Sequence, residues 1–155
     1  MGESQRGQKA NPQDVLQRWA DGKTTLKEVR GYSDEELYSV ARTAYVFYYQ
    51  GRIAEARTLF QGLYAINPLD SYFAKALGVV ELAAGNSQGA LQAYDVAVKL
   101  SPEDPGGYVG RAEVKLTLGQ KAQAIEDLRS AAEVVTEEDP LYPKVSAMLA
   151  ALTRR

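Results

Sequence analysis

An internal repeat of 34 residues constrains the fold of this chain more than any other feature. Three successive copies keep the residue type at four of five marker positions, and the proline at the fifth is lost only in the last copy. The markers are Gly51, Ala56, Phe60, Leu63 and Pro68, then Gly85, Ala90, Tyr94, Ala97 and Pro102, then Gly119, Ala124, Leu128, Ala131 and Thr136. A unit of this length cannot bury its apolar side chains alone, so each copy must stack on the next.

This period and these markers are typical of the tetratricopeptide repeat, a pair of antiparallel helices. We therefore predict an all-α fold, a tetratricopeptide-repeat solenoid of three helix pairs with an N-terminal helical extension and a C-terminal capping helix. The predicted parts are a disordered tail (1–10), the extension (11–36), three repeats (37–70, 71–104 and 105–138) and the capping helix (139–155).

Helix start and stop signals agree with this division. Ser33 and Glu36 form a capping box before a helix that is predicted to run to about Tyr49. The next helix is predicted over 53–66, because the Asn67-Pro68 pair ends it. The later repeats are predicted to open at the caps Asp70 and Asp104.

Tyrosines mark one face of the first predicted helix of the first repeat. Tyr38, Tyr45 and Tyr49 are 7 and 4 residues apart and share a helix face, with Tyr48 at its margin. The helix is expected to pack into the solenoid through another face, which carries Val40, Thr43, Ala44 and Phe47. First helices line the concave surface of such solenoids, so the tyrosines are expected to face a groove. There they would offer apolar area and hydroxyl groups to a peptide. The alternative is that these rings are core residues, covered by the N-terminal segment.

Glycines within the predicted third repeat add a hypothesis about the groove. Gly106 and Gly110 stand inside a helix, where each costs about 1 kcal/mol relative to alanine. They are expected to widen the groove for a bulky ligand side chain. The alternative is a more loosely packed third repeat.

Composition excludes several functions. The net charge is −2 without a basic cluster, which argues against a nucleic-acid or anionic-membrane surface. No apolar run is long enough to span a membrane and no secretory signal is visible, so a cytoplasmic protein is expected. The chain has no Cys and no His, which removes disulfides and the common nucleophile–base pairs and metal sites. We predict neither an enzyme nor a metal or cofactor site.

The predicted N-terminal extension carries apolar residues at helical spacing, Val15, Leu16 and Trp19. Because they precede the solenoid, this face must be buried against the first repeat or against a second copy of the chain. The sequence leaves both options open.

The N-terminal half resembles the bacterial type III secretion translocator chaperones (class II), a tetratricopeptide-repeat family. The residues concerned are Phe47-Tyr48, Gly51-Arg52-Ile53, Glu55-Ala56, Phe60, Leu63, Asp70-Ser71, Phe73 and Leu77-Gly78, with Gly22-Lys23-Thr24-Thr25-Leu26 ahead of Leu37-Tyr38-Ser39-Val40-Ala41. The resemblance extends from about Trp19 to Val135. It departs from the family where Ala112-Glu113-Val114 replaces a cysteine-bearing element, and where Leu37-Tyr38 stands three residues farther from Gly51.

The resemblance implies a cytosolic chaperone that holds an extended segment of hydrophobic pore-forming translocators in its concave groove, and that forms a homodimer through its N-terminal helices. It carries the family's groove aromatics over onto Tyr45 and Tyr48. The full set of candidate groove residues is Tyr38, Tyr45, Tyr48, Tyr49, Tyr72, Lys75, Val79, Leu82, Glu113 and Leu116.

Two other functions are alternatives to the chaperone. An adaptor for chaperone C-termini needs a clamp of Lys, Asn and Arg, but Ala41 and Tyr45 stand at two of those positions. A scaffold within a larger complex is compatible with the sequence, and it would bind through surfaces other than the groove.

Overall fold

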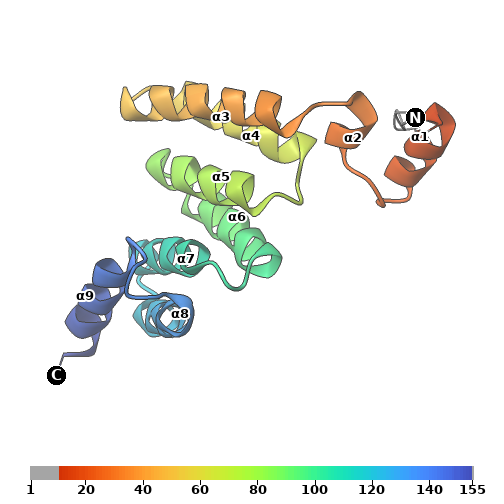
Figure 1. Cartoon of the computed structure of the whole chain (residues 1–155). Coiled ribbons are helices and arrows are strands. Elements are labelled where there is room, and N and C mark those ends of the chain that lie inside the picture. The colour runs from red at the N-terminus through yellow and green to blue at the C-terminus, as the bar shows by residue number, and fades with distance from the viewer. Residues whose placement is uncertain (1–10, 155) are drawn as a thin grey trace, which may run out of the picture.

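The structure, a computed structural model, describes residues 11–154, apart from the side chains of Pro12, Val15, Leu16 and Trp19. This part of the chain contains nine helices and no strand (Figure 1). They are α1 (Pro12–Ala20), α2 (Leu26–Arg30), α3 (Asp34–Tyr49), α4 (Ile53–Ile66), α5 (Ser71–Ala83), α6 (Ser87–Leu100), α7 (Pro105–Thr117), α8 (Lys121–Val134) and α9 (Tyr142–Thr153). The predicted disordered tail, 1–10, lies outside the described residues.

Six of these helices form three hairpin-like pairs, α3 with α4, α5 with α6 and α7 with α8, and consecutive pairs stack on one another (Figure 1). The predicted all-α solenoid is therefore confirmed. The short α1 and α2 lie beyond the first pair, and α9 packs on α8 at the opposite end.

The turn within each pair is made by a glycine with positive φ. Gly51, Gly85 and Gly119 have φ values of 77°, 81° and 73°. A residue with a Cβ in this left-handed region costs roughly 1–2 kcal/mol. The 34-residue spacing of these glycines thus records the spacing of the hairpin turns.

The helix starts use the predicted caps. Ser33 and Glu36 exchange side-chain and backbone hydrogen bonds in a capping box at α3. Asp70 accepts from the backbone N–H of Tyr72 at the start of α5, and Asp104 accepts from the backbone N–H of Gly106 at the start of α7. Each cap satisfies a donor that the first helical turn leaves unpaired.

The repeat markers in the second helices form the buried core. These residues are Ala56, Phe60 and Leu63 in α4, Ala90, Tyr94 and Ala97 in α6, and Ala124, Leu128 and Ala131 in α8. The small residues let neighbouring helices approach closely, and the bulky residue between them fills the space under the next pair.

The predicted packing face of α3 is correct only in part. Ala44 is fully buried, but Val40 is 39% exposed and Thr43 is also exposed. The buried stripe is Leu37, Ala41 and Ala44, at spacings of four and three residues. The face that packs on α4 and α5 is therefore rotated from the predicted one. Small alanines form much of it, and the prediction gave more weight to larger apolar residues.

Buried carboxylates link adjacent helices of the stack. Glu81 in α5 is 4% exposed and Asp127 in α8 is also 4% exposed. Glu81 accepts hydrogen bonds from Arg57, Gln61 and Asn86, and Asp127 binds Arg111 and Lys115. Because every donor comes from another helix or from a turn, each carboxylate ties neighbouring elements of the stack together.

Different elements cover the two ends of the stack. At the C-terminal end, Val145 of α9 is almost fully buried against Val109 and Ala131. At the N-terminal end, α2 contacts α4 and α1 contacts α2. Within the described part of the chain, no helix is long and apolar enough to cross a membrane.

Candidate functional site

Two adjoining hollows lie on the face formed by the first helices of the pairs. The larger, of about 600 Å³, is lined by α3 and by Val79 of α5. The smaller, of about 210 Å³, also contains Tyr45 and Val79, and it extends to α7. Together we call them the tyrosine groove, whose lining residues are Arg42, Tyr45, Val46, Tyr48, Tyr49, Tyr72, Lys75, Val79, Tyr94 and Gly106.

Tyr45 occupies the centre of the groove, because it lines both hollows. Its ring lies edge-to-face on the buried Phe60 at 4.9 Å between centroids, and on Tyr72 at 6.3 Å. Burial raises the pKa of Tyr45 to about 12, and the neighbouring Tyr72 and Tyr49 add to this effect. The hydroxyl therefore stays protonated at neutral pH. The fixed ring offers apolar surface with little entropy left to lose on binding.

Two more tyrosines extend the groove along α3. Tyr49 is 80% exposed and stacks on Tyr45 at 6.2 Å, while Tyr48 is half-buried and meets Tyr45 edge-to-face at 6.5 Å. Core residues are rarely this exposed, so the ring of Tyr49 is not part of the core. Tyr45 and Tyr49 thus face the groove as the stripe predicts, and Tyr48 joins them from the margin.

Tyr38, the remaining member of the stripe, lines neither hollow of the groove. Its hydroxyl donates a hydrogen bond to Oδ2 of Asp70 over 2.6 Å, and its ring packs on Tyr72 and Phe73, each at 5.4 Å. The hydrogen bond to the Asp70 carboxylate, together with burial, raises the pKa of Tyr38 to about 12. This residue ties α3 to the start of α5.

The other candidates divide into two groups. Tyr72, Lys75 and Val79 of α5 line the smaller hollow. Leu82, Glu113 and Leu116 do not line either hollow of the groove. Leu82 packs against the core around Tyr94, Leu116 packs against the buried cluster of Ala112, Ala124 and Leu128, and Glu113 forms an ion pair with Lys144 of α9.

Three lining residues, Arg42, Val46 and Tyr94, were not predicted to be near the groove, and Gly106 was expected only to widen it. Arg42 lies three residues before Tyr45 on α3, so helical spacing alone could have found it. As the bulky marker of the second repeat, Tyr94 is expected to be a packing residue. The sequence carries no signal that its side chain reaches the opposite face of the stack.

The hypothesis that Gly110 makes room for a ligand is wrong. A Cβ at Gly110 would lie 2.1 Å from Cε1 of Tyr94, so the glycine accommodates a side chain of the protein itself. Gly106 does line the smaller hollow, next to the ammonium group of Lys75, which pairs with Asp104. The alternative of a loosely packed third repeat is also wrong at Gly110, because the contact there is tight.

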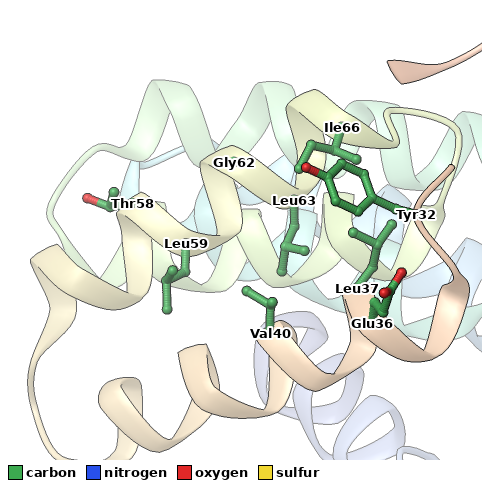
Figure 2. Close-up of a pocket in the computed structure, with 9 residues that line it drawn as sticks. All are labelled: Tyr32, Glu36, Leu37, Val40, Thr58, Leu59, Gly62, Leu63 and Ile66. Atoms are coloured by element: carbon green, nitrogen blue, oxygen red, sulfur yellow. The ribbon is translucent and has the colours of Figure 1, made fainter. Parts of the chain in front are cut away.

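A third hollow, of about 370 Å³, lies at the N-terminal end of the stack, and we call it the end hollow. Figure 2 shows Leu37 and Val40 of α3 and Leu59 and Leu63 of α4 lining it, with Tyr32 beside Ile66 at one side. Glu36, Thr58 and Gly62 complete the lining. The predicted dimerisation residues Val15, Leu16 and Trp19 belong to α1, but their side chains lie outside the described part of the structure.

Comparison with known proteins supports a family assignment. A family model described as tetratricopeptide repeat matches residues 41–105. The low calcium response locus protein H of Yersinia pestis is 31% identical over 130 residues, which cover 82% of this chain and 76% of that protein.

Solved structures agree with that relationship. The type III secretion translocator chaperone SycD of Yersinia enterocolitica matches with a TM-score of 0.77 and 26% identity, over 83% of this chain and 98% of SycD. SycD in complex with a peptide of the translocator YopD matches with a TM-score of 0.71 and 27% identity, over 77% of this chain and 94% of that chain. The protein therefore belongs to the tetratricopeptide-repeat family of type III secretion translocator chaperones.

Proposed function

We propose that this protein is a bacterial cytoplasmic chaperone. It holds an extended segment of a hydrophobic type III secretion translocator in the tyrosine groove, and so keeps the translocator soluble and competent for secretion. The crystallised complex of SycD with a YopD peptide supports this proposal by relationship. Within this chain, the observation that carries it is the shared lining of the two hollows by Tyr45 and Val79.

The shape and chemistry of the groove suit an extended chain. Packed helices lie about 8–10 Å apart, so the first helices of three pairs span roughly 20 Å. Extended chain rises about 3.3 Å per residue, and some six residues therefore fit across α3, α5 and α7. Tyrosine rings supply apolar contact for the side chains, and protonated hydroxyls supply hydrogen-bond donors for the backbone.

The remaining parts of the chain have supporting roles in this proposal. Residues 37–70, 71–104 and 105–138 form the three repeats, and 139–155 cap the last of them. The extension, 11–36, makes a homodimer, in which Val15, Leu16 and Trp19 of one copy meet the end hollow of the other. That hollow is apolar and open, and an exposed apolar surface of this kind is a site of association.

A capture experiment with matched variants tests the proposal. The tagged wild type, Tyr45→Ala/Tyr48→Ala and the control Tyr64→Ala are incubated with lysate of the native bacterium, after circular dichroism has shown that all three are folded. Tyr64 is a half-buried tyrosine of α4 that faces the second helices, away from the groove. We expect wild type and control to retain a protein with apolar membrane-spanning segments, and the double variant to lose it.

The opposite result would contradict the proposed function. If the double variant retains the same protein, the groove does not hold it, and the role of a scaffold that binds through other surfaces takes the place of the chaperone. Overlapping synthetic peptides of the captured protein then locate the bound segment. The predicted contacts of Tyr38, Leu82, Glu113 and Leu116 remain predictions that this mapped peptide can test.

A further inference from the structure

Tyr94 belongs to α6, a second helix, yet its ring passes between two first helices to reach the tyrosine groove. A Cβ at Gly78 of α5 would lie 2.6 Å from Cε2 of the ring, and a Cβ at Gly110 of α7 would lie 2.1 Å from Cε1. Both distances are too short for any side chain. The two glycines therefore form the passage through which this ring crosses the stack.

The hydroxyl at the tip of this ring has no partner within the described part of the chain. Tyr94 is 4% exposed and lines the smaller hollow together with Tyr45, Tyr72, Lys75, Val79 and Gly106. Across the same residues, no fully buried side-chain oxygen or nitrogen lacks a hydrogen bond. The hydroxyl is consequently not sealed in the core. It opens into the hollow, where its donor is available to a ligand.

The charged side chains close to the hollow are already engaged. Lys75 pairs with Asp104, and Glu113 pairs with Lys144. Burial raises the pKa of Tyr94, and the negative charge of Glu113 raises it further. The hydroxyl is therefore a neutral O–H group at any working pH, and an acidic ligand side chain beside Glu113 would be repelled.

We propose that the hydroxyl of Tyr94 donates a hydrogen bond to a main-chain carbonyl of the segment bound in the tyrosine groove. This inference rests on the proposed function. A carbonyl is a neutral acceptor, and every residue of an extended chain offers one. Tyr94 thus fixes the register of the segment across the hollow, and Gly78 and Gly110 position its ring.

Removal of the hydroxyl alone tests this contact. The probe is a fluorescein-labelled synthetic peptide of the translocator segment mapped above, and its affinity is measured by fluorescence anisotropy. We expect Tyr94→Phe to bind about fivefold to tenfold more weakly than wild type. The thermal midpoint should stay unchanged, because the lost hydroxyl has no partner in the free protein. The control Tyr64→Phe should leave both the affinity and the midpoint unchanged.

Ester substitution in the peptide identifies the acceptor. An ester carbonyl is a weaker acceptor than an amide carbonyl, so one position of an ester scan should weaken binding to wild type. At that position Tyr94→Phe should show no further loss. Gly110→Ala provides a second test. The added Cβ displaces the ring of Tyr94, so this variant should also bind the unmodified peptide more weakly than wild type.

The outcomes separate this inference from the proposed function. If wild type binds the peptide and Tyr94→Phe binds it equally well, the inference is wrong and the proposed function stands. If Tyr94→Phe lowers the thermal midpoint while affinity is unchanged, the hydroxyl is structural and the inference is also wrong. If wild type does not bind any segment of the translocator, both fall together.

Discussion

The guanidinium Nε of Arg57 in α4 lies 3.0 Å from Oε1 of Glu81 in α5, on the opposite side of the stack from the tyrosine groove. The same carboxylate accepts from Gln61 at 3.0 Å and from Asn86 at 2.7 Å. One side chain thus joins the first pair, the second pair and the turn inside the second pair. Such a group is costly to bury unless all of its donors are present.

The carboxylate of Glu81 makes stability depend on pH. Burial alone would raise its pKa, but the hydrogen bonds from Arg57, Gln61 and Asn86 outweigh burial and leave the pKa below its usual value of 4.5. The ionised form is therefore favoured by folding, so its contribution is complete above about pH 4.5 and is lost as the pH falls through the lower folded-state value. We expect the free energy of unfolding to decrease over this acidic range.

Glu81→Gln isolates that contribution. At pH 7 the variant should be less stable than wild type by about 2 kcal/mol, because the buried site loses the ionised acceptor of its charge-assisted hydrogen bonds, while water solvates the partly exposed Arg57. The gap should shrink as the pH falls below 4.5, which urea unfolding at a series of pH values will measure. A gap of constant size across the series would show that titration of Glu81 is not its source.

Tyr38 is expected to contribute to stability more than to binding. Tyr38→Phe removes the hydrogen bond to Asp70 but keeps the ring contact with Phe73, so the cost should be about 1 kcal/mol. Affinity for the mapped translocator peptide should change by less than about twofold, because Tyr38 lines neither hollow of the groove. A large loss of affinity at unchanged stability would instead place this hydroxyl against the bound segment.

Replacement by alanine should change the stability of the protein in opposite directions at two glycines that both have free space around the added Cβ. No side chain lies within 4 Å of a Cβ built at Gly119 or at Gly62, so neither change causes a clash. Gly119 has a φ of 73°, and its replacement should destabilise the protein by roughly 1–2 kcal/mol. Gly62 lies inside α4, where alanine should stabilise by about 0.5–1 kcal/mol. Urea unfolding of both variants checks the pair, and equal shifts would contradict the backbone explanation.

The sequence predicts the solenoid well because its signals are local and repeated. A glycine at each turn, a cap at each first helix and small residues in each second helix all recur with one period. Contacts between repeats carry no such signal. Glu81 and Arg57 are 24 residues apart, and neither residue type indicates which other residue it pairs with.

The site was harder to predict than the fold, for a reason that Tyr94 illustrates. Its position within the repeat correctly indicates a buried ring, and the ring is 4% exposed. Whether the hydroxyl ends inside the core or opens into a groove depends on the absence of side chains at Gly78 and Gly110. Whether these two glycines lie on either side of the ring is decided by how α5, α6 and α7 pack together, and no single stretch of the sequence specifies that packing.

The end hollow should control self-association if the proposed dimer forms. Val40 lines this hollow and is 39% exposed, so Val40→Lys places a charge in the apolar surface without disturbing the core. We expect sedimentation velocity to find a concentration-dependent dimer for wild type and a monomer for Val40→Lys. Val46→Lys is the matched control, since Val46 is a 51% exposed valine of the same helix that lines the tyrosine groove instead. This control should remain dimeric but lose affinity for the translocator peptide. A dimeric Val40→Lys would exclude the end hollow as the interface, and a wild type that stays monomeric at every concentration would exclude the dimer itself.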